Sequence, residues 1–276
     1  MDRELAVPLV EACDEAAFGG KAVSLGAAIR AGLPVPPGLA VGTMLVERVA
    51  ADHGAAAAAL LSSPHLPAAR LAVRSSAVGE DSAGASFAGQ HVTRLNVYRA
   101  QLIDAVRDVW SSAHTESARA YRERKGLPGQ ARIGVVVQAL VEPIAAGVLF
   151  TRNPMTGADE RVIEAAWGLG EAVVSGAVVP DRFTLDASGR VVEIVPGDKD
   201  VKIWYGDGDG TIEVPVAPEM RETPCLTEEQ LGGLHELAER CRRVWGPNLD
   251  LEWALGAEGT MYLLQCRPIT TLSSHQ

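Results

Sequence analysis

The chain has 276 residues, of which 47% are hydrophobic and 22% are charged. At roughly 150 residues per domain this length suits one large domain or two lobes, and the composition excludes a disordered, collagen-like or coiled-coil protein. Asp and Glu number 35 against 25 Lys and Arg, which gives a formal net charge of -10. Such a balance disfavours binding to nucleic acid or to an anionic membrane surface.

No segment of the sequence is predicted to anchor the chain in a membrane. The longest purely apolar run, 55–61, is far shorter than the ~20 residues that span a bilayer. The first residues carry no basic region followed by an apolar one, which predicts a cytoplasmic protein. Four widely spaced cysteines form no CxxC pair and are predicted to be reduced thiols with structural roles; they are Cys13, Cys225, Cys241 and Cys266.

The first half of the chain is predicted to be rich in helix. Apolar residues at helical spacing predict a helix over 21–31, which Gly32 and the proline cluster of 34–37 end. The other predicted elements of this half are a helix at 55–59, a strand at 71–74, a loop of small residues at 75–89 and a helix at 101–125.

The second half is predicted to be rich in strands. Five runs have strand character, at 133–140, 147–151, 161–166, 190–195 and 201–204. Thr227 and Gln230 form a capping box that begins a helix over 228–243. The last element is a hairpin of 249–255 and 260–267. We therefore expect an α+β chain with an N-terminal lobe of about 1–138 and a β-rich C-terminal lobe of about 139–276.

The hairpin is predicted to carry polar chemistry on one face, because strand side chains alternate between faces. If Leu255 pairs with Thr260, Asp250 lies opposite Gln265 and Glu252 opposite Leu263. The polar face then carries Asp250, Glu252, Gln265 and Arg267. The apolar face carries Leu249, Leu251, Trp253, Leu255, Tyr262, Leu264 and Cys266.

Two carboxylates and an amide oxygen suit Mg²⁺, and a guanidinium suits a phosphate. A solvated outer face of an amphipathic hairpin is the alternative, and a turn of odd length would change the register.

Two glycine-containing segments could bind phosphate. Lys21 follows Gly19 and Gly20 at the start of a helix, where backbone N–H groups and the helix dipole favour anions, although the Walker A spacing is absent. Arg74 ends a strand that opens into the small-residue loop, whose amides could cover a polyphosphate. A plain loop-to-helix junction and a flexible surface loop remain the respective alternatives.

The histidines and serines show no catalytic pattern. The sequence contains neither HExxH nor GxSxG, and His114 falls within a predicted helix, which favours a structural role.

Five ordered segments together resemble the ATP-binding domain shared by phosphoenolpyruvate synthase, pyruvate phosphate dikinase and rifampin phosphotransferase. They cover nearly the whole chain. They are GGKAVSLGAAIRAGLPVPPGLAV from Gly19, LAVRSSAVGEDSAGASFAGQ from Leu71, GVLFTRNPMTG from Gly147, WGLGEAVVSG from Trp167, and DLEWAL with LLQCRPIT near the C-terminus. The resemblance implies an ATP-grasp-type fold, in which two lobes bind Mg·ATP between them.

The resemblance also implies roles for individual residues. Lys21, Arg74 and Arg267 match phosphate-binding residues that act in catalysis, and Asp250, Glu252 and Gln265 match the metal site. Glu252 and Gln265 also match nucleotide contacts. The remaining implied nucleotide contacts are Gly89, Thr93, Gln138 and Leu140.

The family splits ATP into AMP and phosphate and passes a phosphoryl group to a histidine on a swivelling domain. This sequence contains no glycine-rich Thr-Ser-His motif and no region matching the acceptor domain, and the stretch from Val41 to Leu71 is shorter than is usual in the family. We therefore expect a Mg·ATP-dependent phosphotransferase domain whose carrier histidine is supplied by another domain or protein, with an unknown acceptor. A direct small-molecule kinase that forms ADP and a non-catalytic ATP-binding module are the alternatives.

Overall fold

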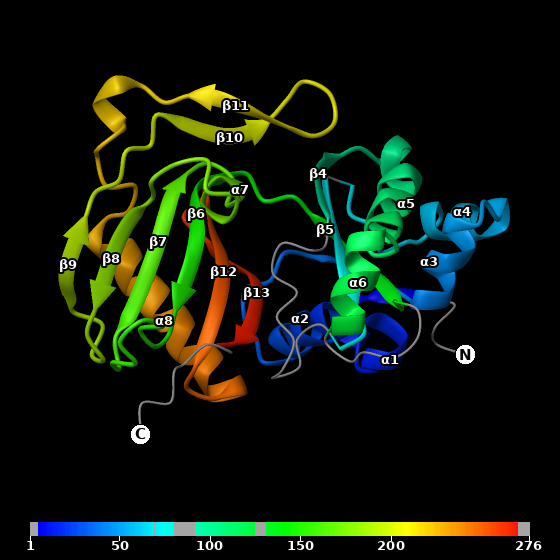
Figure 1. The fold of residues 1–276 in the computed structure, drawn as a ribbon, viewed down its shortest axis with the longest axis horizontal. Coiled ribbons are helices and arrows are strands. Elements are labelled where there is room, and N and C mark those ends of the chain that lie inside the picture. The colour runs from blue at the N-terminus through cyan, green and yellow to red at the C-terminus, as the bar shows by residue number, and fades with distance from the viewer. Residues whose placement is uncertain (1–4, 69, 80–91, 125–130, 270–276) are drawn as a thin grey trace. The chain divides into compact units, whose positions relative to one another are not determined.

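The computed structural model describes residues 5–68, 70–79, 92–124 and 131–269. The chain forms two compact units, shown as a ribbon in Figure 1. The first unit comprises residues up to Arg30, Pro36–Leu140 and the short segment Gly206–Gly210. The second comprises Ala31–Val35, Val141–Tyr205 and Thr211 onward.

The first unit is built on a five-stranded antiparallel sheet with the strand order β1-β2-β5-β3-β4. Its strands are β1 (Ala6–Pro8), β2 (Gly38–Val41), β3 (Leu71–Ala77), β4 (Thr93–Val97) and β5 (Ile133–Ala139). Its helices are η2 (Leu9–Glu11), α1 (Glu15–Phe18), α2 (Gly20–Arg30), α3 (Thr43–Ala50), α4 (Gly54–Leu61), η3 (Arg99–Gln101), α5 (Leu102–Ser112) and α6 (Glu116–Arg124).

Alternation along these strands divides the two faces of the sheet. Leu71 and Val73 of β3 and Val135 and Val137 of β5 belong to one buried apolar cluster with side chains of α3, α4 and α5. The intervening residues of β3 face the opposite side, where Ser76 contacts the first turn of α2. Helices therefore pack on both faces, and α2 shares its face with Arg74.

The second unit is built on a six-stranded antiparallel sheet with the strand order β13-β12-β6-β7-β8-β9. Its strands are β6 (Pro143–Phe150), β7 (Arg161–Trp167), β8 (Asp181–Leu185), β9 (Val191–Val195), β12 (Leu249–Gly256) and β13 (Met261–Pro268). A separate hairpin is formed by β10 (Val201–Tyr205) and β11 (Thr211–Pro215). The helices are α7 (Glu171–Val174), η4 (Pro218–Met220) and α8 (Glu228–Trp245).

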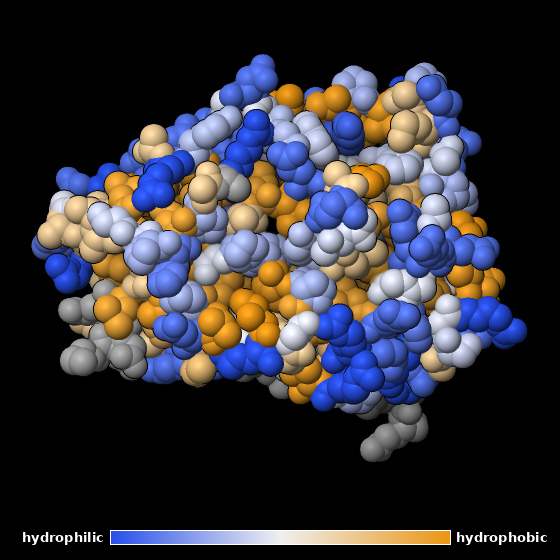
Figure 2. Space-filling model, turned by 180° about the vertical axis from the view of Figure 1, so that it is seen from behind, coloured by the Kyte–Doolittle hydropathy of each residue, from blue (hydrophilic) through white to orange (hydrophobic). Residues whose placement is uncertain are grey.

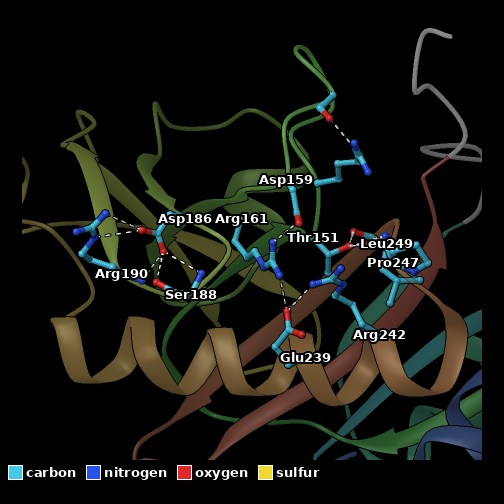
Figure 3. Close-up of polar contacts among 12 residues, drawn as sticks. Thr151, Asp159, Arg161, Asp186, Ser188, Arg190, Glu239, Arg242, Pro247 and Leu249 are labelled. Atoms are coloured by element: carbon cyan, nitrogen blue, oxygen red, sulfur yellow. Dashed lines mark hydrogen bonds and ion pairs between the residues drawn. The ribbon is translucent and has the colours of Figure 1, made fainter.

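Helix α8 covers one face of this sheet and begins at the predicted capping box. The Thr227 side chain accepts from the Gln230 N–H, and the Gln230 side chain accepts from the Thr227 N–H. Arg161 of β7, almost fully buried, donates to Glu239 of α8 and to Asp159, as Figure 3 shows. The opposite face of the sheet, which we call the open face, carries the polar residues of the hairpin.

Two further contacts stabilise the edges of these units. Thr151 Oγ1 donates to the Pro247 carbonyl (2.7 Å) and accepts from the Leu249 N–H (2.7 Å), which joins the end of β6 to the start of β12 (Figure 3). Within the first unit, the amide nitrogen of Asn96 donates to the carbonyls of Gly208 (2.6 Å) and Gly210 (2.9 Å).

Most predicted elements are present, and two differ from the expectation. The single helix expected over 101–125 is instead α5 followed by α6, because the chain turns at 113–115, where the His114 ring stacks on Trp110 and its Nδ1 contacts the Trp110 carbonyl (2.8 Å). The strand expected at 71–74 continues to Ala77, so Ser75 and Ser76 belong to β3 and not to the loop. Short strands β1, β2, β4, β8 and β11 were not predicted.

Hydrophilic and hydrophobic residues are interspersed on the surface seen in Figure 2. None of the helices in the described part of the chain is both long and apolar enough to cross a bilayer. All four cysteines are free thiols; Cys13 is exposed and the other three are buried.

Candidate functional site

The start of α2 is fixed against β3 by a glycine and a hydroxyl. Gly19 has a φ of +80°, and a Cβ there would lie 1.9 Å from the Ser76 carbonyl oxygen, so no larger residue fits without movement. The Ser76 hydroxyl accepts from the Ala22 N–H at 2.9 Å and caps one of the first amides of the helix. Lys21, in this first turn, is 6% exposed. The helix start therefore holds a buried cation on the face of the sheet that carries Ser76.

Three other predicted residues lie on the same face of the first sheet. Arg74 lies opposite Thr93 of β4 and Val136 of β5, and Gln138 is two residues farther along β5, opposite Ala72. Opposed and alternate residues share a face, so Arg74, Thr93 and Gln138 all lie on the α2 side. Arg74 and Gln138 are buried, whereas Thr93 is exposed at the sheet edge. The structure thus gathers two cations and an amide on this face.

The end of β5 is already hydrogen-bonded to neighbouring backbone. Gln138 Nε2 donates to the Pro36 carbonyl at 3.1 Å, which orients its amide. The Leu140 N–H donates to the Arg70 carbonyl at 2.7 Å. Gly89, the remaining residue singled out in this half, lies outside the described residues.

The hairpin of the second unit presents its predicted polar set on the open face, although the predicted register is wrong. Asp250 pairs with Arg267 and not with Gln265. Glu252 pairs with Gln265 and not with Leu263. Alternation still places all four side chains on one face. On the other face of β12, the side chains of Leu249, Leu251, Trp253 and Leu255 are buried.

Two one-residue irregularities explain the register. Leu255 pairs with Met261 and not with Thr260, so the turn has odd length, and a bulge between Glu252 and Trp253 adds a second shift. Together the two irregularities move the strand pairing by two residues, so the polar residues near Asp250 still share one face. In the part of the hairpin between the turn and the bulge, Trp253 pairs with Leu263, which is buried in place of the predicted Leu264. Tyr262, expected on the apolar face, instead donates its hydroxyl to Glu258 at 2.9 Å.

Asp250 and Arg267 form an ion pair on this face. Arg267 Nε and Nη2 both lie 2.8 Å from Asp250 Oδ2, which fixes the plane of the guanidinium. Burial raises the pKa of Asp250 above its ordinary value, Arg267 opposes this shift, and the nearby Glu252 charge adds to it. The site therefore concentrates negative charge, which Arg267 only partly balances.

The donor set fits a hard divalent cation that is bound together with a phosphate. Glu252 and Gln265 are direct neighbours across the strands and offer a carboxylate and an amide oxygen. Among the described residues there is no group of three or more His, Cys, Asp or Glu that could hold a metal. Mg²⁺ usually takes only one or two protein carboxylates and completes its shell with water and substrate phosphates. The pair thus meets the requirement of a phosphate-bound Mg²⁺.

The segment WGLGEAVVSG packs against β6 on the open face, a location that sequence reasoning did not predict. Gly168 has a φ of +77° and forms a bridge with Ile203 of β10, and a Cβ at Gly170 would contact Ala146 on the open face at 3.6 Å. Glu171 accepts from the Thr211 hydroxyl at 2.9 Å. The glycines therefore let this turn and β10 pack closely on the sheet, and the glycine spacing of the segment was the available signal.

Residues 55–276 match the family model described as "Pyruvate phosphate dikinase, AMP/ATP-binding domain". The chain is 35% identical over 302 residues to a probable phosphoenolpyruvate synthase of Methanothermobacter thermautotrophicus, covering 92% of this chain and 44% of that protein. It is 41% identical over 225 residues to a rifampicin phosphotransferase of Streptomyces, covering 80% of this chain and 26% of that protein. The chain thus spans less than half the length of either relative.

Among solved structures, D-alanyl-alanine synthetase A of Vibrio cholerae aligns with a TM-score of 0.37 at 14% identity, covering 98% of this chain and 60% of that one.

Proposed function

Because the chain belongs to the pyruvate phosphate dikinase AMP/ATP-binding domain family, we propose that it binds Mg·ATP and transfers a phosphoryl group to a carrier histidine, with AMP and phosphate as the other products. The observation that carries this proposal is the open face of the β12–β13 hairpin. There, Asp250, Glu252, Gln265 and Arg267 are fixed on adjacent strands. This set combines metal-ligand oxygens with a phosphate-binding guanidinium.

We assign the phosphate contacts to Lys21, Arg74 and Arg267. Phosphoryl transfer spreads negative charge over the transferring group, so positioned cations stabilise the transition state more than the ground state. Lys21 and Arg74 are buried on one face of the first sheet, which supports this role because buried cations interact strongly with an anion. Arg267 is oriented by Asp250, so we assign Asp250 a positioning role in addition to its acidic contribution near the metal.

We assign Glu252 and Gln265 to Mg²⁺, whose charge would neutralise the phosphate oxygens during transfer. Gln138 and Leu140 are assigned to the adenine base. Since the Leu140 N–H already donates to Arg70, its carbonyl is the group we expect to accept from the adenine amino group. Gly89 and Thr93 complete the assigned nucleotide contacts.

The carrier histidine is proposed to lie outside this chain. The sequence has no glycine-rich Thr-Ser-His segment. This chain covers only 44% and 26% of the lengths of the two matched relatives. We therefore propose a phosphohistidine carrier domain or protein as the partner, with a small-molecule acceptor of unassigned identity.

The test is chromatography of the nucleotides formed from Mg·ATP, with and without a purified phosphohistidine carrier domain. We expect AMP that depends on the carrier and that Glu252→Ala abolishes. ADP as the product would instead favour a direct kinase. Nucleotide binding without any product would favour a binding module.

A further inference from the structure

A second carboxylate lies on the open face in the same cross-strand row as the proposed metal pair. Pairing runs from Gln265 to Glu252, then to Val148 of β6, Glu164 of β7 and Arg182 of β8. Directly opposed residues share a face, and neighbouring strands lie about 4.8 Å apart. Glu164 is therefore about 10 Å from Glu252 by two strand spacings, with only Val148 between them.

The Glu164 carboxylate is half-buried and has no partner among the described residues. Arg182 is directly opposite on β8, and oppositely charged cross-strand neighbours normally pair. Within the described part of the chain, however, no ion pair or hydrogen bond joins either side chain to another group. Because no protein donor engages it, the half-buried Glu164 carboxylate keeps both oxygens available to the donors of a ligand.

The backbone of Glu164 is held close to β6 by a glycine. A Cβ at Gly147 would lie 1.9 Å from the Glu164 carbonyl oxygen, so the two strands approach at a distance that only glycine permits. Glycine inside a strand commonly marks such a close approach. The position of Glu164 relative to Val148 and Glu252 is thus set by the sheet and not by a loop.

We propose that Glu164 binds the ribose hydroxyls of the nucleotide whose phosphates are held at Glu252, Gln265 and Arg267. This inference rests on the proposed function. A carboxylate accepts two hydrogen bonds, which matches the two vicinal hydroxyls of a ribose. Two strand spacings are comparable with the distance from the β-phosphate to the ribose hydroxyls of an extended nucleotide. Val148, half-buried between the two carboxylates, offers an apolar contact for the sugar ring.

The test compares the dissociation constants of Mg·ATP and Mg·2′,3′-dideoxy-ATP for the unsubstituted chain and for Glu164→Ala. Because hydrogen bonds to a charged group are strong, we expect Glu164→Ala to weaken ATP binding about tenfold or more. It should leave dideoxy-ATP binding unchanged, since the hydroxyls that contact Glu164 are missing. An equal loss for both nucleotides, or no loss for either, would overturn the assignment.

Two variants make the result specific to this side chain. Glu193→Ala makes the same substitution on the same face, on β9 opposite Thr184, and should leave both constants unchanged. Glu164→Gln keeps the side-chain volume and should weaken ATP binding less than alanine does, again without affecting dideoxy-ATP. If alanine prevents folding, the glutamine variant decides the question.

The outcomes also distinguish the ribose assignment from the proposed function on which it rests. If the unsubstituted chain fails to bind Mg·ATP, the proposed function is overturned together with the ribose assignment. If the chain binds and turns over Mg·ATP but Glu164→Ala does not distinguish the two nucleotides, only the ribose assignment is overturned.

Discussion

The two units use their principal helices differently. In the first unit, α2 packs on the face of the sheet that carries Arg74 and Gln138, and it contributes Lys21 to that face. In the second unit, α8 covers the face opposite Asp250 and Glu252 and contributes no residue to the open face. Anchoring α2 is therefore part of building the site, whereas anchoring α8 supports the sheet beneath it.

The same type of contact between helix and sheet therefore has different consequences in the two units. A change at the junction of α2 and β3 should alter both stability and nucleotide affinity. A change at the junction of α8 and β7 should alter stability alone. Three substitutions test that separation, and a fourth, at Glu252, tests the open face itself.

The largest effect is expected from Gly19→Ala. The new Cβ would collide with the Ser76 carbonyl and the residue would need a positive φ, so we expect a loss of about 3–5 kcal/mol in the free energy of unfolding. Gly32→Ala is the matched control, because its φ is also positive at +74° but a Cβ meets open space. It should cost only about 1 kcal/mol. Urea unfolding of both variants measures the difference, and equal losses would contradict the packing argument.

Glu252→Ala is expected to reduce the rate of AMP formation about 100-fold or more, because it removes a proposed metal ligand. The side chain is half-buried on the open face, so circular dichroism should remain unchanged. Glu236→Ala, an exposed position on α8, makes the same chemical change away from the open face and should retain full activity. Loss of the circular dichroism signal in the Glu252 variant would instead indicate a structural role.

Ser76→Ala removes the hydroxyl that caps the Ala22 N–H. Loss of a helix cap predicts a decrease of about 1 kcal/mol in the free energy of unfolding. Because Lys21 lies in the same turn, affinity for Mg·ATP should fall as well. Calorimetry and urea unfolding together test the claim, and a variant that loses stability with unchanged affinity would separate α2 anchoring from nucleotide binding.

Much of this arrangement follows from local sequence. The capping box at Thr227 and Gln230 begins α8 as predicted, and the Gly32 and proline signals end α2. The alternation of Asp250 with Glu252 correctly predicted a shared polar face with Gln265 and Arg267.

The remaining features depend on contacts between distant segments. The bulge at Glu252 and Trp253 is set by pairing between strands, so local spacing could not place Leu263 in the core. Ser76 belongs to β3 because β5 extends the pairing to Ala77, not because of its own propensity. Glu164 joins the row of Glu252 only through the order of the strands in the sheet, which no local pattern encodes.

The smallest effect is expected from Glu239→Gln in α8. Although partial burial alone would raise the pKa of Glu239, its hydrogen bonds with Arg161 and Arg242 hold the pKa below its usual value of 4.5. Because the pKa of Glu239 is lower in the folded protein than in the unfolded chain, its carboxylate stabilises the fold above pH 4.5. This contribution is lost as the pH falls through the pKa of the folded protein. The variant should therefore lose about 0.5 kcal/mol at neutral pH, since Asp159 still pairs with Arg161, and should match the unsubstituted chain in strong acid.

Thermal unfolding from neutral pH to strong acid measures the difference in stability between the variant and the unsubstituted chain. Affinity for Mg·ATP is the second readout. Because α8 lies on the face opposite Glu252, affinity should be unchanged at every pH at which the protein is folded. A loss of affinity equal to that of Ser76→Ala would show that the two helices support the site in the same way.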